Sequence, residues 1–180
     1  MRLSEGGVNL TTRNQHIRLC IARSLLKLME DKPFEKITIT EVVNNASVSR
    51  MTFYKYYRSK LEVLSDYMYE IVNEYMKESK MSTDVGNFRD YEHIWHCFSF
   101  FKQYSSFILT LIQADMHAVI MNALNDYMDT YILQASEFSR YELYCYAGAL
   151  CNTYLKWIEL GMQETPEEIA TMVMTAVGSK

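Results

Sequence analysis

The 180-residue sequence has little glycine, proline or cysteine, with six Gly, two Pro and four Cys. This scarcity excludes collagen-like and low-complexity chains. The cysteines form no C-x-x-C pair and are too few for a disulfide framework, which favours free thiols in a reducing cytoplasm. The chain also lacks an apolar secretion signal and any run of ~18 apolar residues that could span a membrane. We therefore expect a compactly folding cytoplasmic protein without a membrane partner.

Charge is distributed unevenly along the chain, although the net charge is only −4. Residues 1–60 contain eleven Lys or Arg against five Asp or Glu, a net +6, whereas residues 61–180 contain seven against seventeen, a net −10. A basic segment indicates contact with a polyanion such as DNA, because the field that steers DNA is local to the face it meets. The alternative is chance unevenness between two solvated surfaces.

Apolar residues recur at intervals of three and four along nearly the whole chain, which predicts an all-α fold of about nine helices. No strand-like alternation or internal repeat competes with this interpretation. We expect a DNA-binding domain over 1–60, a connecting helix from 59 to about 80, a loop over 81–87 and a second domain over 61–180. The remaining helices are expected at 12–30, from 38 for two turns, from 49, and at 91–103, 105–113, 116–135, 140–161 and 166–177.

Helix boundaries are marked by local sequence signals. Thr38-Ile39-Thr40-Glu41 and Ser59-Lys60-Leu61-Glu62 are capping boxes, in which the hydroxyl and the carboxylate each satisfy a backbone amide. Gly161 stands where a C-terminal cap is expected, and Pro166 stands at a first helical position. The last two helices are therefore predicted to meet at a tight corner.

Two short helices joined by a short turn, the second rich in Arg, Lys, Thr and Tyr, are typical of a helix-turn-helix that enters the major groove. The exposed start of the second helix would reach base edges, where Arg50 could donate twice to guanine and a methyl group could touch thymine. Phosphate contacts would fix the register. The base-reading candidates are Ser49, Arg50, Met51 and Thr52, and the phosphate candidates are Tyr54, Lys55, Tyr56 and Lys60. A structural hairpin with a solvated basic face is the alternative.

Three segments, 32–39 (KPFEKITI), 47–54 (SVSRMTFY) and 59–61 (SKL), resemble the DNA-binding domain of TetR-family transcriptional regulators over residues 12–64. The resemblance implies that Thr38 and Lys60 anchor phosphates, that Tyr54 contacts the DNA backbone and that the third helix reads bases. Ser47 replaces the usual glycine of the turn, so it adopts a left-handed conformation or the turn is rearranged. Tyr56 and Tyr57 replace the usual His and Phe, which leaves the role of position 56 open.

The C-terminal segments 146–150, 157–162 and 165–170 resemble the last two helices of the same family, which implies a four-helix dimer interface. Small residues at 147–149 would permit close helix approach. The candidate interface residues are Ala147, Leu150, Tyr154, Trp157, Ile158, Ile169, Met172 and Val173. The same spacing fits residues that only fill the core of one chain.

Aromatic residues and methionine are abundant, with fourteen Tyr, eight Phe and twelve Met. A cavity lined by such side chains would suit a small apolar or aromatic effector. The candidate ligand-binding residues are Trp95, Phe98, Phe101, Tyr104, Phe107, Met116 and Tyr154. Ordinary core packing is the competing explanation.

Evidence for metal or enzyme chemistry is weak. His93, His96 and Cys97 lie at i, i+3 and i+4, with His117 further along, but no second cluster completes four ligands. Ser99-Phe100-Phe101-Lys102 matches a Ser-x-x-Lys motif without its companion motifs. We therefore expect no catalytic residue, no metal and no cofactor.

These observations together predict a homodimeric repressor that a small-molecule effector releases from operator DNA. The alternative is a helix-turn-helix co-regulator whose C-terminal bundle binds a protein partner and has no ligand pocket.

Overall fold

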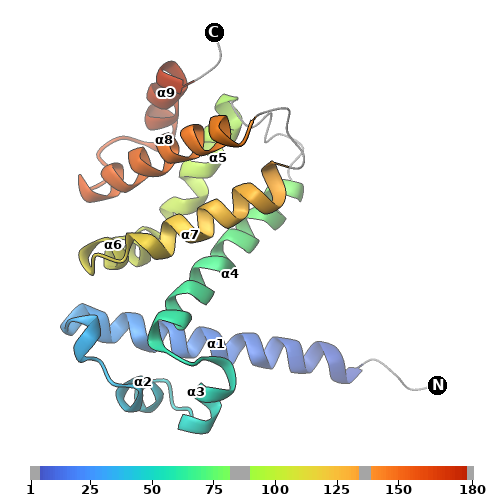
Figure 1. Cartoon of the computed structure of the whole chain (residues 1–180), viewed down its shortest axis with the longest axis vertical. Helices are drawn as coiled ribbons and strands as arrows, with labels where there is room; N and C mark the ends of the chain where they lie inside the picture. Colours follow the sequence, from blue (N-terminus) through green and yellow to red (C-terminus); the bar gives the residue numbers. More distant parts are fainter. Residues whose placement is uncertain (1–4, 82–89, 134–138, 178–180) are drawn as a thin grey trace. The chain divides into compact units, whose positions relative to one another are not determined.

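The computed structural model describes residues 5–81, 90–133 and 139–177. These residues form nine α-helices, one 3₁₀ turn and one π turn, without a strand (Figure 1). The chain divides into two compact units after Met68, whereas we expected the division after Lys60. Helix α4 (Lys60–Met81) begins in the first unit and continues into the second.

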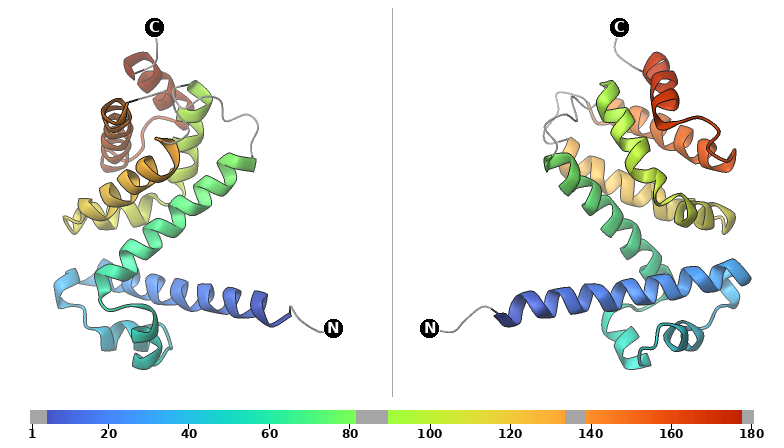
Figure 2. Two further views of the ribbon diagram at one scale, coloured as in Figure 1. Left: turned by 45° about the vertical axis from the view of Figure 1, so that its right-hand side comes forward. Right: turned by 180° about the vertical axis from the view of Figure 1, so that it is seen from behind.

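The N-terminal unit contains α1 (Glu5–Asp31), the 3₁₀ turn η1 (Phe34–Lys36), α2 (Ile39–Asn45), α3 (Arg50–Tyr56) and the start of α4. Helices α2 and α3 lie on the same side of α1 (Figure 2). The expected start of the first helix at residue 12 is wrong, because α1 already begins at Glu5. Once a helix is nucleated, each further residue adds a hydrogen bond, so weak helix formers such as Gly6 and Gly7 are incorporated.

Apolar side chains from all four helices meet in the core of the N-terminal unit. Ile21 and Leu25 of α1, Val42 of α2, Phe53 of α3 and Leu64 of α4 are fully buried. The Ser24 hydroxyl is buried among them and donates to the Val42 carbonyl at 2.7 Å, so its polar atom is satisfied. This core holds the two short helices, which are too short to be stable alone.

The C-terminal unit contains α5 (Tyr91–Lys102), α6 (Ser105–Gln113), α7 (His117–Tyr127), the π turn η2 (Met128–Ile132), α8 (Arg140–Glu159) and α9 (Pro166–Val177). The helix expected over 116–135 is present from His117 to Ile132, but its hydrogen bonding changes from α to π at Met128. The Leu133 amide donates to the Met128 carbonyl five residues back, at 2.9 Å. Of the loop expected over 81–87, Met81 instead ends α4, and residues 82–87, like residues 134–135, lie outside the described residues.

The corner between α8 and α9 confirms the predicted caps. Gly161 has a φ of +83°, and its amide and that of Met162 donate to the carbonyls of Ile158 and Trp157 at 2.9 and 2.8 Å. This is a Schellman motif, in which a left-handed residue closes the helix end. Pro166 is the first residue of α9, as expected.

The core of the C-terminal unit lies among α5, α8 and α9. Its buried members are Ile94, Phe98, Tyr146, Leu150, Trp157, Ile169, Ala170 and Val173. None of the described helices is both long enough and apolar enough to cross a membrane.

Candidate nucleic-acid interface

Helix α2 begins at the predicted capping box. The Glu41 amide donates to the Thr38 hydroxyl at 3.3 Å, and the Thr38 amide donates to the Glu41 carboxylate at 2.8 Å. Lys32 pairs with the same carboxylate. Lys32 first, and then the Thr38 donors, lower the pKa of Glu41 to about 2. Thr38, a predicted phosphate anchor, is exposed but uses its hydroxyl within this cap.

The turn between α2 and α3 is a second Schellman motif. The Val48 amide donates to the Val43 carbonyl at 3.0 Å, and the Ser47 amide donates to the Asn44 carbonyl at 3.2 Å. Ser47 has a φ of +53°, so it takes the left-handed conformation that glycine adopts without strain. Of the two alternatives left by the sequence, the strained serine is the one observed.

The start of α3 presents polar side chains outward. The Thr52 amide donates to the Ser49 hydroxyl at 2.9 Å, which makes Ser49 the helix cap. Arg50 and Met51 follow, both exposed, with 85% of the Met51 side chain accessible. Phe53 is fully buried and fixes the opposite face of the helix. The four predicted base-reading residues therefore lie together at one exposed tip, where Thr52 is half-buried.

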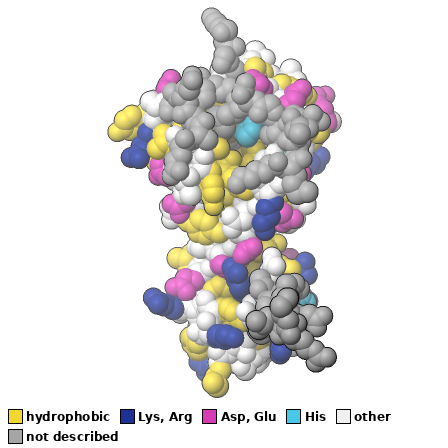
Figure 3. All heavy atoms as spheres, turned by 90° about the vertical axis from the view of Figure 1, so that its right-hand side faces the viewer, with side chains coloured by type: hydrophobic (Ala, Val, Ile, Leu, Met, Phe, Trp, Pro, Cys, Tyr) yellow, Lys and Arg dark blue, Asp and Glu magenta, His cyan; other side chains and the backbone are white. Residues whose placement is uncertain are grey.

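The middle of α3 carries an aromatic and basic surface. Tyr54 is 50% exposed, and its ring meets that of Phe53 edge-on at 5.6 Å. The Lys55 ammonium lies 5.3 Å from the centre of the Tyr56 ring. Tyr54, Lys55 and Tyr56 follow the exposed tip along α3, and these are residues predicted to contact phosphates. In Figure 3, Lys and Arg side chains are spread over the visible face of the N-terminal unit, interspersed with acidic ones.

Tyr56 and Tyr57 are held by other helices of the unit. The Tyr56 hydroxyl donates to Asn14 Oδ1 at 2.6 Å, and the Tyr57 hydroxyl donates to Asp66 Oδ2 at 2.6 Å. Arg18 pairs with the same Asp66 carboxylate. Sequence reasoning missed Asn14, Arg18 and Asp66. No local signal distinguishes them from surface residues, because their partners lie up to 48 positions away.

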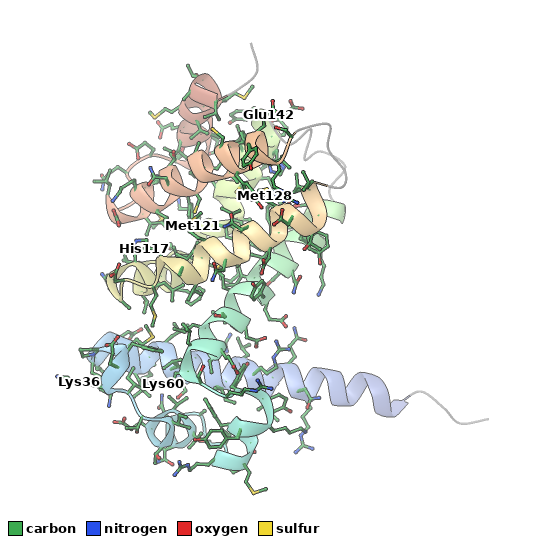
Figure 4. All side chains as sticks on the ribbon, viewed as in Figure 1. Lys36, Lys60, His117, Met121, Met128 and Glu142 are labelled. Carbon is green, nitrogen blue, oxygen red and sulfur yellow. The ribbon has the colours of Figure 1, made fainter. Side chains whose placement is uncertain are left out.

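Lys60, labelled in Figure 4, is directed at backbone. Its ammonium donates to the carbonyls of Phe34 and Ile37, both at 2.5 Å, and lies 4.3 Å from the centre of the Phe34 ring. Burial is the main cause that lowers the pKa of Lys60. Two of the three N–H donors of Lys60 are thus used to close the end of η1, so Lys60 has fewer donors with which to bind a phosphate.

The predicted ligand-binding residues do not converge on one point. Phe98 is buried against Trp157, with ring centres 5.6 Å apart, and the Tyr154 hydroxyl donates to the Phe101 carbonyl at 2.7 Å. Trp95 instead donates to Glu167 at 3.0 Å and is 38% exposed. Tyr104 donates to Glu74 at 2.8 Å, Phe107 is buried on α6, and Met116 is half-buried just before α7.

Most predicted interface residues are buried within a single chain. Ala147, Leu150, Trp157, Ile158, Ile169 and Val173 are each at most 8% exposed, and Tyr154 is half-buried. Core filling, the alternative left open by the sequence, therefore accounts for these six. Met172 of α9 is 57% exposed, Tyr141 of α8 is 82% exposed, and Leu160, the C-terminal cap of α8, is 72% exposed.

The candidate metal ligands His93, His96, Cys97 and His117 do not converge on one point. His96 Nε2 lies 3.1 Å from a Glu78 carboxylate oxygen, and burial lowers the pKa of His93 to about 4. His117 is exposed and lies 3.5 Å from Asp115. Burial raises the pKa of the Cys97 thiol to about 12. In the described part of the chain, no three His, Cys, Asp or Glu side chains gather as a metal site would require.

The fold and this interface define an all-helical regulator with an N-terminal helix-turn-helix. Residues 21–67 match the model "Bacterial regulatory proteins, tetR family", and residues 90–178 match the model "Transcriptional regulator C-terminal region". Together these models cover about three quarters of the chain. The chain belongs to the TetR family of transcriptional regulators.

A solved TetR transcriptional regulator from Streptococcus agalactiae 2603V has the same fold, with a TM-score of 0.65. The alignment covers 94% of this chain and 98% of that chain, at 20% sequence identity. Comparison with curated proteins gives no significant match.

Proposed function

We propose that this protein is a homodimeric repressor that binds a specific operator and leaves it when a small apolar or aromatic effector binds the C-terminal unit. The observation that carries the proposal is the tip of α3, where Arg50 and Met51 project outward while Phe53 is fully buried. Such a tip can enter a major groove and read base edges. The proposed place of action is the cytoplasm, and the proposed role is not catalytic.

Individual residues take distinct roles in this proposal. Arg50 donates to guanine, and Met51 or Thr52 touches a thymine methyl group. Lys55, Tyr54 and the Tyr56 ring face phosphates. Thr38 and Lys60 contribute mainly by fixing α2 and η1, because their polar atoms already have partners in the unit.

Dimerisation supplies the spacing that the operator requires. Two recognition helices reach successive half-sites when they are about 34–36 Å apart. We assign the contact between protomers to the exposed apolar side chains of α8, its C-terminal cap and α9, namely Tyr141, Leu160 and Met172. An effector that shifts occupancy from nearly full to nearly empty must favour one state by about 5.5 kcal/mol.

The proposal is tested with DNA selected from a random-sequence pool by the purified protein. Arg50→Ala should weaken binding to the selected duplex about 5- to 150-fold and change binding to unrelated DNA little, because it removes a base contact. The matched variant Lys55→Ala should weaken both and lower the salt dependence by about one phosphate. Enrichment of no sequence by the wild-type protein would overturn the proposal.

A co-regulator that binds a protein partner is the second candidate, and the close ring packing of the C-terminal unit favours it. The rings of Phe98, Tyr154 and Trp157 lie 5.6–6.3 Å apart, which is ordinary aromatic core contact. The apolar dye anilinonaphthalene sulfonate distinguishes the two. Saturable binding with enhanced fluorescence in the native protein favours an effector site, and its absence favours the co-regulator.

A further inference from the structure

One carboxylate in the N-terminal unit joins three helices. Asp66, in the second turn of α4, accepts from the Tyr57 hydroxyl at 2.6 Å and from Arg18 Nε at 2.9 Å through Oδ2. Its Oδ1 accepts from a second Arg18 nitrogen. Arg18 belongs to α1, and Tyr57 caps the C-terminal end of α3. The C-terminal end of α3, the proposed recognition helix, is therefore linked through Asp66 to both α1 and α4.

These hydrogen bonds are of a strong type. A bidentate Arg–carboxylate pair and a hydroxyl donating to a carboxylate are charge-assisted and fix orientation as well as distance. The side chains of Arg18 and Asp66 are only 31% and 28% exposed, which reduces competition from water. Burial, followed by the bond to Asp66, raises the pKa of Tyr57, so its hydroxyl remains a donor at all ordinary pH values.

The ring of Tyr57 has a packing role that is separable from its hydroxyl. The side chain is 4% exposed, and its ring centre lies 5.8 Å from that of Phe53. Tyr57→Phe would therefore keep the packed ring and remove only the link to Asp66. This separation allows the hydrogen bond to be tested without opening a cavity.

We propose that Tyr57 and Asp66 are positioning residues that fix the direction of α3 relative to α4, and that a tilt of α4 reaches the recognition helix through this pair. The inference rests on the proposed operator binding and deepens it, because it names the contact that regulation would act on. Neither residue is proposed to touch DNA.

The length of α3 makes its inner end a sensitive point. Seven residues of helix extend about 10 Å, so a tilt of about 10° at Tyr57 moves the tip at Arg50 by nearly 2 Å. A displacement of that size breaks a hydrogen bond to a base edge, because such bonds tolerate only a few tenths of an ångström. Phosphate contacts by long Lys side chains tolerate it, since they depend on charge more than on orientation.

The test measures affinity for the selected duplex and for unrelated duplex DNA, together with the melting temperature. Tyr57→Phe should weaken specific binding about tenfold and leave non-specific binding within about twofold. Tyr69→Phe is the matched control, because it removes another Tyr–Asp hydrogen bond on α4, to Asp126, that does not involve α3. It should leave both affinities unchanged.

A second variant, Asp66→Asn, keeps an acceptor for Tyr57 but loses the ion pair with Arg18, and we expect an intermediate loss of specific binding. A melting temperature that falls while the ratio of specific to non-specific affinity stays constant in Tyr57→Phe would overturn the inference, since the pair would then only stabilise the unit. Absence of any sequence preference in the wild-type protein would overturn the proposed function itself, and this outcome is read before any variant is made.

Discussion

Each unit has an apolar core, but ring packing is prominent inside the C-terminal unit, whereas the short helices of the N-terminal unit depend on caps and charge-assisted hydrogen bonds. In the N-terminal unit, polar side chains fix the short helices one by one: Thr38 and Ser49 cap them, Lys60 closes η1, and Asp66 ties α3 to α4. In the C-terminal unit, Tyr75 alone contacts the rings of Phe100, Phe101 and Tyr127 at 5.2–6.3 Å. Directional bonds specify one geometry, whereas ring packing supplies stability and accommodates several arrangements.

This difference suits the proposed division of labour. A surface that reads base edges needs atoms fixed to a few tenths of an ångström, which caps and charge-assisted hydrogen bonds provide. A unit that responds to an effector needs an interior that can rearrange at small cost. Methionine and phenylalanine side chains provide such an interior, because they carry no hydrogen-bond donor that must find a new partner when they repack.

Phe98→Ala gives the largest expected effect and tests whether the two units are stabilised separately. Removing a fully buried ring should lower the unfolding free energy of the C-terminal unit by about 3–5 kcal/mol. Amide hydrogen exchange should show faster exchange in α5, α8 and α9 and unchanged exchange in α1–α3. Equal acceleration in both units would mean that they unfold as one.

As the pH falls, the C-terminal unit should lose stability before the capping box of Thr38 and Glu41 loses its contribution. Burial lowers the pKa of His93 to about 4 in the folded protein, whereas the pKa of this histidine in the unfolded chain is near 6.5. The unfolded chain therefore binds the proton first, and stability falls as the pH drops from about 6.5 to 4. The loss amounts to about 3 kcal/mol, as an order of magnitude. Glu41 has a pKa lowered to about 2, so its contribution is complete above about pH 4.5 and is lost between there and pH 2.

Tryptophan fluorescence measures the first of these transitions selectively, because Trp95 and Trp157 both belong to the C-terminal unit. In urea titrations between pH 7 and 4, His93→Gln should show a smaller decline of stability than the wild-type protein. An identical decline in both proteins would assign the acid sensitivity to other groups.

Ser47→Gly gives the smallest expected effect and tests the strain in the turn before α3. Glycine adopts the observed left-handed conformation without a Cβ clash, so the variant should be more stable by up to about 1 kcal/mol. Ser49→Ala, two residues later, should instead cost about 1 kcal/mol because it removes the helix cap. Thermal denaturation followed by circular dichroism measures both, and destabilisation by Ser47→Gly would contradict the assigned conformation.

Local signals in the sequence predicted much of the fold. The caps at Thr38, Ser49 and Gly161 involve residues within six positions of each other, so short windows contain the information. The turn at Ser47 also lies within such a short window, so its left-handed conformation was one of the two alternatives that the sequence predicted. The tip of α3 could be predicted as a candidate site because its residues are consecutive.

Long-range features could not be predicted from these signals. The partners of Tyr56 and Tyr57 lie on other helices, 42 and 9 positions away, and nothing near Asp66 marks it as a partner of α3. Apolar periodicity identifies a buried face but not what covers it, so Trp157 fitted a dimer interface and a core equally well. No signal in the sequence marked the change to π hydrogen bonding at Met128, a residue that is buried in the C-terminal unit.

Several cations of the N-terminal unit have partners within the unit, so its formal charge overstates the number of cations that can bind DNA phosphates. Arg18 is paired with Asp66, Lys32 with Glu41, and Lys60 with two carbonyls. Ions leave the condensed atmosphere around DNA only when a protein cation takes their place beside a phosphate. The number of ions released on binding should therefore follow the exposed cations, such as Lys55 and Arg50, and fall short of the eleven Lys and Arg residues in the first sixty positions.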